Sequence, residues 1–294
     1  MKPTKLVPFL LFLVFLVFLV SCNSSPEDVE LQDFKTGIFE VELNLLDNAP
    51  PDKIYPNSNF KIVADVHNMA GYDMHNGEVK VVGLTDEYFI IDQEQQSIID
   101  LEGRGLTNPE GDREFKEFSV SAGQLFLNAE QRNEPFFLKV SYDSTMEFSD
   151  TICINPNLYE VYQSGCKVEG HSSYAGQGAP LVATNMEEII SPGENPSVEF
   201  RLFLKNQGVG KVDMVRLEGA RLGGKEIVCR FEDVEGVEIR EIKLDEKKQE
   251  AVLICNEPLD RLSSYSTTFF TEFSYSYSFK EKRTLTLVNS AFRK

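Results

Sequence analysis

Hydrophobic and polar residues alternate along most of the chain after residue 37, which is the pattern of β-strands with one buried face. Segment 38–46 (IFEVELNLL) places four apolar side chains on one face, and segment 269–279 has Phe or Tyr at most of its odd positions. No stretch shows a helical stripe of useful length. The sequence therefore predicts an all-β fold, with further strands at 60–66, 78–84, 115–120, 136–142, 198–205, 227–231, 237–244, 251–255 and around 285–287.

A faint internal repeat links the two halves of the chain. Segments 60–84 and 198–219 each contain a strand, then an asparagine, then a Gly-containing turn, then a strand that runs into a glycine. Asn68 and Asn206 occupy corresponding places in this comparison. The distance between the copies indicates a repeat unit of roughly 100 residues or slightly more, which is a common size for a single domain.

The ends of the two proposed repeats are also similar. Segment 136–154 (FFLKVSYDSTMEFSDTICI) and segment 269–287 (FFTEFSYSYSFKEKRTLTL) both begin with Phe-Phe and are rich in aromatic residues. In each, a polar stretch follows, and a second apolar alternation begins with threonine. We interpret each segment as an aromatic-rich strand, a polar turn and a second strand.

Two repeats of this size, each with about seven short strands, suggest tandem β-sandwiches. The strand, Asn-x-Gly turn, strand pattern resembles Ig-like modules of the CARDB type, which occur in prokaryotic surface proteins. That resemblance implies two tandem Ig-like antiparallel β-sandwich domains. We place the first domain at 37–154, a connector at 155–180 and the second domain at 181–290.

The chain begins with a basic and then apolar segment. Lys2 and Lys5 precede fifteen residues, 6–20, that are apolar apart from Pro8. As a helix this run would cover about 22 Å, which is short of the ~30 Å hydrocarbon core of a bilayer. A basic start, a short apolar run and a small residue after it are the layout of a secretory signal peptide.

The four residues Leu19-Val20-Ser21-Cys22 resemble the lipobox of prokaryotic lipoproteins. In that family the chain is cut before the cysteine, which then carries a lipid. The resemblance implies a signal peptide at 1–21, lipidation of Cys22 and a polar tether at 22–36. The alternative is an ordinary signal peptide, or a short anchor helix, with an incidental cysteine.

The chain is strongly acidic, with a formal net charge of −18 from 29 basic and 47 acidic residues. Removal of residues 1–21 takes away two lysines and no acid, so the mature chain is more acidic still. Such a surface repels nucleic-acid phosphates and anionic lipid headgroups. We therefore expect no nucleic-acid partner, and we expect attachment to the membrane to depend on the lipid on Cys22.

Four cysteines remain beyond Cys22, and an even number in an exported chain favours disulfides. Of the three pairings, we favour the two local ones, Cys153 with Cys166 and Cys229 with Cys255. A zinc site of cysteines would need C-x-x-C pairs, which the sequence lacks.

Motifs for catalysis are weak. GHSSYAG at 170–176 breaks the G-x-S-x-G pattern, because position 174 is Tyr and no helix is predicted after it. His67, Asp73 and His75 are close enough in sequence to hold a divalent metal, although polar turn residues are more often simply solvated. We expect no enzyme activity, no cofactor and no bound metal.

Loops are the more promising places for contact with a partner. The candidate interaction residues are Tyr72, Met74 and His75 in one turn, and Tyr159, Tyr162 and Tyr174 in the connector.

Together these features predict an exported protein that is lipid-anchored on the extracytoplasmic side of a cell membrane. It would use two β-sandwich domains in interaction, adhesion or a structural role, with an envelope protein or a glycan as partner. The alternatives are a solute- or glycan-binding lipoprotein and an envelope hydrolase with scattered catalytic residues.

Overall fold

Antiparallel strands make up the fold, as the alternation predicts. The computed structural model describes residues 34–98, 100–126, 129–156, 165–232, 240–260 and 263–289. These residues belong to one compact unit. The predicted signal peptide, Cys22 and most of the predicted tether lie outside the described residues.

Most of the predicted strands are present, strands at 89–91, 95–97, 171–173 and 181–191 were not predicted, and residues 237–239 of one predicted strand lie outside the described residues. The first half contains β1 (Val41–Leu45), β2 (Asn59–Asn68), β3 (His75–Val82), β4 (Phe89–Ile91), β5 (Gln95–Ser97), β6 (Arg113–Ala122) and β7 (Gln131–Ile154). The second half contains β8 (His171–Ser173), β9 (Leu181–Ser191), β10 (Ser197–Asn206), β11 (Lys211–Leu222), β12 (Lys225–Glu226), β13 (Val228–Phe231), β14 (Glu241–Lys243), β15 (Glu250–Pro258) and β16 (Tyr265–Val288).

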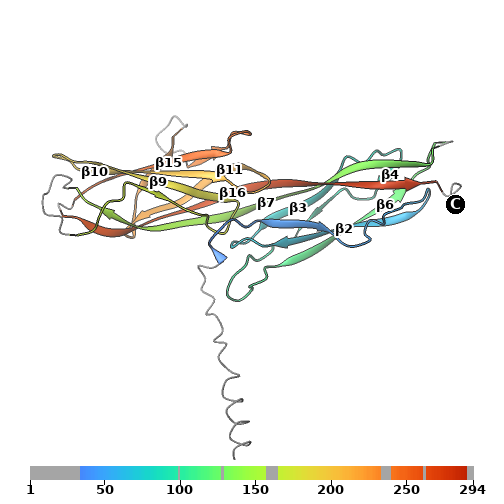
Figure 1. Ribbon diagram of the computed structural model, residues 1–294, viewed down its shortest axis with the longest axis horizontal. Helices are drawn as coiled ribbons and strands as arrows, with labels where there is room; N and C mark the ends of the chain where they lie inside the picture. Colours follow the sequence, from blue (N-terminus) through green and yellow to red (C-terminus); the bar gives the residue numbers. More distant parts are fainter. Residues whose placement is uncertain are drawn as a thin grey trace, which may run out of the picture. The chain divides into compact units, whose positions relative to one another are not determined.

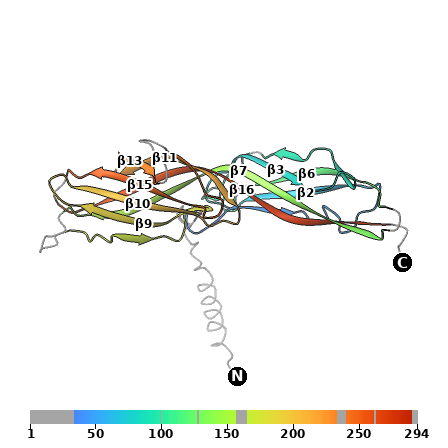
Figure 2. The same ribbon diagram turned by 90° about the horizontal axis from the view of Figure 1, so that it is seen from above.

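These strands form three sheets. A four-stranded sheet has the order β1-β2-β6-β4, and a five-stranded sheet has the order β13-β15-β10-β9-β8. A seven-stranded sheet has the order β12-β11-β16-β7-β3-β5, with β14 also paired to β11. The layers are sandwich-like (Figures 1 and 2), and Phe200 of β10 contacts Phe269 of β16 across them with 4.9 Å between ring centroids.

The two longest strands, β7 and β16, are each 24 residues long and lie side by side along their whole length (Figure 1). Their pairing runs from Gln131 opposite Val288 to Ile154 opposite Tyr265 without a register shift. The first half of β7 also pairs with β3, and the first half of β16 also pairs with β11. The seven-stranded sheet is therefore shared by both halves of the chain.

The prediction of polar turns inside segments 136–154 and 269–287 is wrong, because each segment is one continuous strand. In β7 the polar residues fall mainly at outward positions, while every second residue stays buried as far as Phe148, as in Tyr142 and Met146. In β16 the alternation continues through the half-buried Glu281 and Arg283 between the buried Phe279 and Leu285. Neither polar stretch contains a glycine or a proline to end the strand. Each polar stretch therefore fits a continuous strand with one solvent-exposed face as well as it fits a turn.

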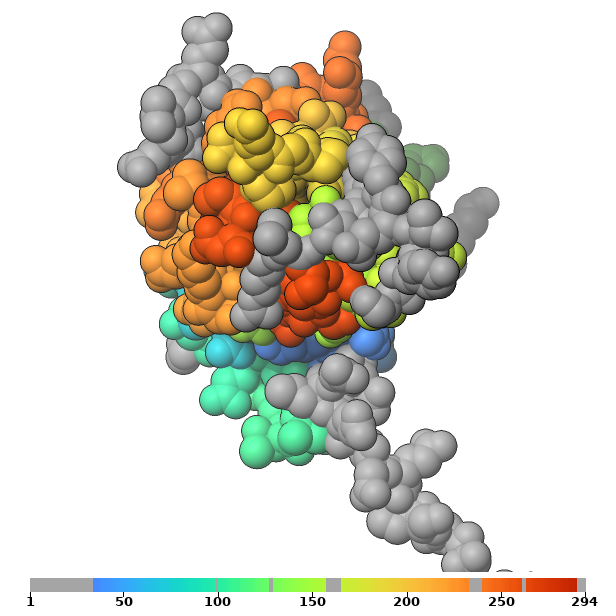
Figure 3. All heavy atoms as spheres, turned by 90° about the vertical axis from the view of Figure 1, so that its left-hand side faces the viewer, coloured from blue at the N-terminus to red at the C-terminus, as the bar shows by residue number. Residues whose placement is uncertain are grey.

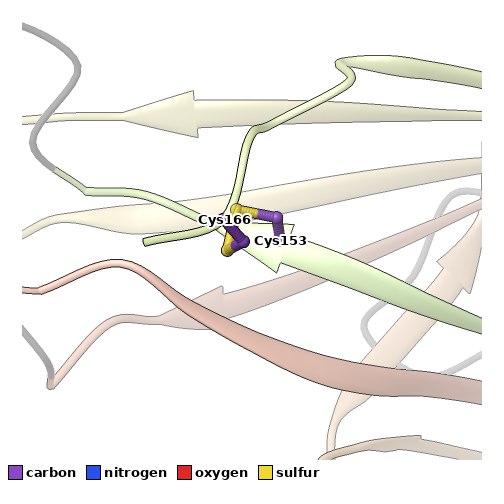
Figure 4. Close-up of a disulfide and its surroundings, with 2 residues drawn as sticks. All are labelled: Cys153 and Cys166. Atoms are coloured by element: carbon purple, nitrogen blue, oxygen red, sulfur yellow. A yellow bond between two sulfur atoms is a disulfide. The ribbon is translucent and has the colours of Figure 1, made fainter. Parts of the chain in front are cut away.

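Both predicted disulfides are confirmed. Cys153 at the end of β7 is bonded to Cys166 (Figure 4), with Cα atoms 5.6 Å apart. Cys229 of β13 is bonded to Cys255, which lies directly opposite on β15. Two disulfides indicate an oxidising, extracytoplasmic environment.

Candidate functional site

A cavity of about 270 Å³ lies beside the Cys153–Cys166 disulfide. Its walls come from the last part of β7, the segment 166–172, two residues of β9 and the start of β16. Figure 3 views the molecule from the side on which β9 and β10 lie in Figure 1, where the yellow-green end of β7 and the orange-red start of β16 are visible. The GHSSYAG motif thus contributes to a cavity, although not as a nucleophile elbow.

Two carboxylates occupy core-facing positions around this cavity. On β7, Asp150 follows the buried Phe148 by two residues and precedes the buried Ile152 by two. On β9, Glu188 lies two residues after the buried Met186. Glu188 also pairs directly with Phe200 of β10, whose side chain is fully buried. Side chains two apart on a strand share a face, so both acids point toward the space between the sheets.

Asp150 has hydrogen-bond partners. The hydroxyl of Tyr174 donates to its Oδ2 at 2.6 Å, and the backbone N–H of Thr151 donates to its Oδ1 at 2.7 Å. The Tyr174 ring packs edge-on against Phe148, with centroids 4.7 Å apart. Burial and the bond to Asp150 raise the pKa of Tyr174, so its hydroxyl stays protonated and holds the Asp150 carboxylate in place.

Glu188 has a different environment. Its Oε1 is buried and has no hydrogen-bond partner in the described part of the chain. Burial raises the pKa of the Glu188 carboxyl to about 7. A buried polar atom without a partner is uncommon in native proteins and usually marks a water or ligand position, or a functional strain.

Lys167, Glu169 and His171 form the exposed rim of the cavity. Ile152, Met186 and the disulfide add an apolar part to the wall. The cavity thus combines an acidic, partly apolar interior with a mixed rim.

The histidines and Asp73 of the predicted turn do not come together. His67 Nε2 lies 2.7 Å from the Glu110 carbonyl oxygen, while His75 Nδ1 lies 3.0 Å from Asp100 Oδ2. Asp73 Oδ1 accepts a hydrogen bond from the Gly103 N–H instead. Across the described ranges, no group of three or more His, Cys, Asp or Glu side chains is arranged to hold a metal ion.

Two of the candidate interaction residues are not at the surface. Tyr72 is 7% exposed and Met74 is 1% exposed, so neither presents its side chain to a partner. The Tyr72 hydroxyl accepts a hydrogen bond from the N–H of Glu147 on β7. His75 is exposed and Tyr174 is half-buried with its hydroxyl bonded to Asp150, while Tyr159 and Tyr162 lie outside the described residues.

A second hollow, which we call the polar trough, lies over the middle of β7 and β16. It has a volume of about 420 Å³. Its lining includes Lys139, Ser141 and Asp143 of β7, Lys211 and Asp213 of β11, and Ser276 and Ser278 of β16. Both β3 and β11 have a register shift beside the centre of the long strand pair, and Asn76 and Asp213 lie within these shifts and line the trough. Such irregularities often re-aim side chains at functional sites.

Asp150 and Glu188 were not among the residues predicted from the sequence. A signal was present, because each acid interrupts an apolar alternation, in Phe148-x-Asp150-x-Ile152 and in Met186-x-Glu188-x-Ile190. A polar residue at an expected core position indicates either an error in the assignment or a functional site.

Comparison with known proteins does not define a family. No protein-family model matches the chain, and no curated protein matches it. Among solved structures, the chain is similar to the E. coli chaperone DraB, with 10% identity over 79% of this chain and 85% of that one and a TM-score of 0.21. It is also similar to a partial N-terminal region of an enterococcal surface protein, with 7% identity over 85% and 86% of the two chains and a TM-score of 0.18. These values give no basis for an argument about function.

In the part of the chain that the structure describes, no helix has the length and apolar character needed to cross a membrane.

Proposed function

We propose that this protein is a non-catalytic, envelope-anchored lipoprotein that presents two Ig-like β-sandwich domains for interaction at the cell surface. The observation that carries the proposal is the pair of disulfides within an all-β fold, downstream of the Leu19–Cys22 segment that resembles a lipobox. An oxidised framework suits an exported chain, and the lipid would hold it at the membrane.

The strand order supports the Ig-like part of the proposal. The order β1-β2-β6-β4 corresponds to strands A-B-E-D of an Ig domain, and β3-β7-β16 corresponds to C-F-G, with β5 as an added edge strand beside C that follows β4 in the chain. The second half has the same two orders in β9-β10-β15-β13 and β11-β16-β7, with β14 beside β11 and with β8 added at the edge next to β9. On this assignment each long strand serves as strand F of one domain and strand G of the other, so the two domains exchange their last strands.

Cross-linking on intact cells tests this function. The tagged chain is purified after cross-linking, and its partners are identified by mass spectrometry. The matched control is Cys22→Ser, which keeps the domains and removes the proposed anchor. We expect a reproducible envelope partner that depends on Cys22. Bulk protein in the cytoplasm, or the same partners for both forms, would refute the proposal.

The polar trough favours solute or glycan binding as a second candidate function. Its lining provides hydroxyl, amide, carboxylate and ammonium groups, with two lysines against three acids. A nearly balanced mixture of donors and acceptors suits a neutral polyhydroxyl ligand better than an ion. A saturable thermal shift with a panel of oligosaccharides, lost in Asp143→Ala, would support it, while no shift with any member would remove it.

A further inference from the structure

The cavity at Glu188 is separate from the polar trough, and its interior is acidic. Two inward side chains are carboxylates, Asp150 and Glu188, and both accept hydrogen bonds when ionised, while the Ser172 hydroxyl lies on the same face, opposite Met186. Asp150 already has two donors, whereas Glu188 Oε1 has none among the described residues. Glu188 Oε1 therefore lacks a donor among the described residues, and a positively charged donor would be favoured most.

No charged group of the described chain supplies that donor. Burial is the sole cause of the raised pKa of Glu188, and neither Lys167 nor any other cation offsets it. Lys167 lies exposed at the rim. An ionised carboxylate without a cationic partner is costly to bury, so this carboxyl takes up a proton instead near neutral pH.

The size and the apolar wall restrict the ligand further. A volume of about 270 Å³ is slightly below the ~300–1,000 Å³ of typical drug-sized sites. Ile152, Met186 and the disulfide provide a surface for a short alkyl chain. Anions are disfavoured, because two acids face the interior and a third, Glu169, lies at the rim.

We propose that this cavity binds a small primary ammonium compound, such as a short alkylamine or diamine, with Glu188 as its counter-ion and Asp150 as a second acceptor. The ammonium group would donate to Glu188 Oε1, and the alkyl chain would lie against the apolar wall. Tyr174 would act as a positioning residue, because its hydroxyl orients Asp150.

The proposal predicts a specific dependence on pH. The cation binds the ionised form of Glu188, whose pKa in the free protein is about 7. Near pH 6 only about one-tenth of this carboxyl is ionised, and near pH 8 about nine-tenths, so binding should weaken about tenfold from pH 8 to pH 6. The other charged groups that face the cavity are Asp150, Lys167, Glu169 and His171. Histidine is the residue type among them that ordinarily titrates in this range, and His171 therefore needs its own control.

The experiment is calorimetric titration of the full chain with putrescine at pH 8 and pH 6. 1,4-Butanediol, which has the same carbon chain without the ammonium groups, is the ligand control. The test variant is Glu188→Gln, and the matched control is Glu187→Gln, on the opposite face of the same strand. His171→Gln tests the histidine at the rim. Circular dichroism establishes that each variant is folded.

We expect saturable binding of putrescine at pH 8, about tenfold weaker binding at pH 6, and none of butanediol. Glu188→Gln should weaken binding at least tenfold at pH 8 and remove most of the pH dependence, while Glu187→Gln and His171→Gln should retain both. No saturable binding at pH 8, or unchanged binding by Glu188→Gln, would overturn the proposal. The proposed function supplies only the extracytoplasmic setting, and cross-linking through Cys22 tests it independently of this result.

Discussion

Asn68 and Asn206 make the same local hydrogen bonds in the two halves of the chain. The side-chain amide of each donates to the carbonyl oxygen four residues later, at 3.0 Å to Tyr72 and 2.9 Å to Gly210. The side-chain oxygen of each accepts from the N–H two residues later, at 3.1 Å from Ala70 and 3.0 Å from Gly208. The repeat seen between segments 60–84 and 198–219 is thus a repeat of structure.

Replacing Asn68 should destabilise the protein. Its side chain is fully buried and also donates to the Leu101 carbonyl oxygen, so Asn68→Ala leaves several buried groups without partners. We expect a loss of about 1–3 kcal/mol in the free energy of unfolding in urea. Asn206→Ala should cost less, because Asn206 is half-buried, and the exposed Asn59→Ala serves as control. Equal effects of Asn68→Ala and Asn59→Ala would contradict this account.

Glu40 and Tyr277 should be energetically coupled. The buried Tyr277 hydroxyl donates to Glu40 Oε2 and accepts from the Gly210 N–H at 2.6 Å. We expect Tyr277→Phe and Glu40→Gln each to lower stability, and the double variant to lose less than the sum. A coupling energy of about 0.5–3 kcal/mol from a double-mutant cycle is expected, and strict additivity would exclude a direct interaction.

The halves should not fold separately. In a fragment of residues 34–180, the first half of β7 keeps β3 but lacks its second partner, which is the second half of β16. The second half of β7 loses its partner too, and this exposes Met146 and Phe148. We therefore expect neither this fragment nor residues 181–289 to unfold cooperatively alone, and we expect mixing to restore the fold. Cooperative thermal unfolding of either isolated fragment would show independent tandem domains instead.

The free energy of unfolding should fall as the pH rises from 4.5 to about 7, because of Glu188. Burial raises the pKa of this carboxyl from 4.5 to about 7, so the folded state binds more protons than the unfolded state between these values. The contribution of Glu188 is thus most favourable below pH 4.5 and is lost as the pH approaches 7. Glu188→Gln should raise the melting temperature at pH 8 and leave it nearly unchanged at pH 4.5. A lower melting temperature of this variant at pH 8 would contradict the assignment.

Much of the fold was predictable because strand alternation and cysteine spacing are local signals. β1 lies within the predicted segment 38–46, β10 covers the predicted segment 198–205, and both disulfides join cysteines close in sequence. The continuous β7 and β16 were not predicted, because a polar outward run resembles a turn when the partner strand is unknown.

The site was harder to predict because it depends on distant contacts. Tyr72 is buried by contacts that include β7, and Met74 bridges to Leu101, neither of which a local window of sequence can show. Asp150 and Glu188 line one cavity only because β7 and β9 lie in facing sheets, and the sequence does not show this arrangement.

The most direct test of the central claim is the intact mass of the membrane-associated protein, measured for the natural chain and for Cys22→Ser. The account predicts a natural chain that begins at Cys22 and is heavier than its residues by acyl groups, with both disulfides oxidised. It also predicts a Cys22→Ser form that is folded but not held at the membrane. A natural chain that retains the mass of residues 1–21, or that lacks any acyl group, would contradict the account.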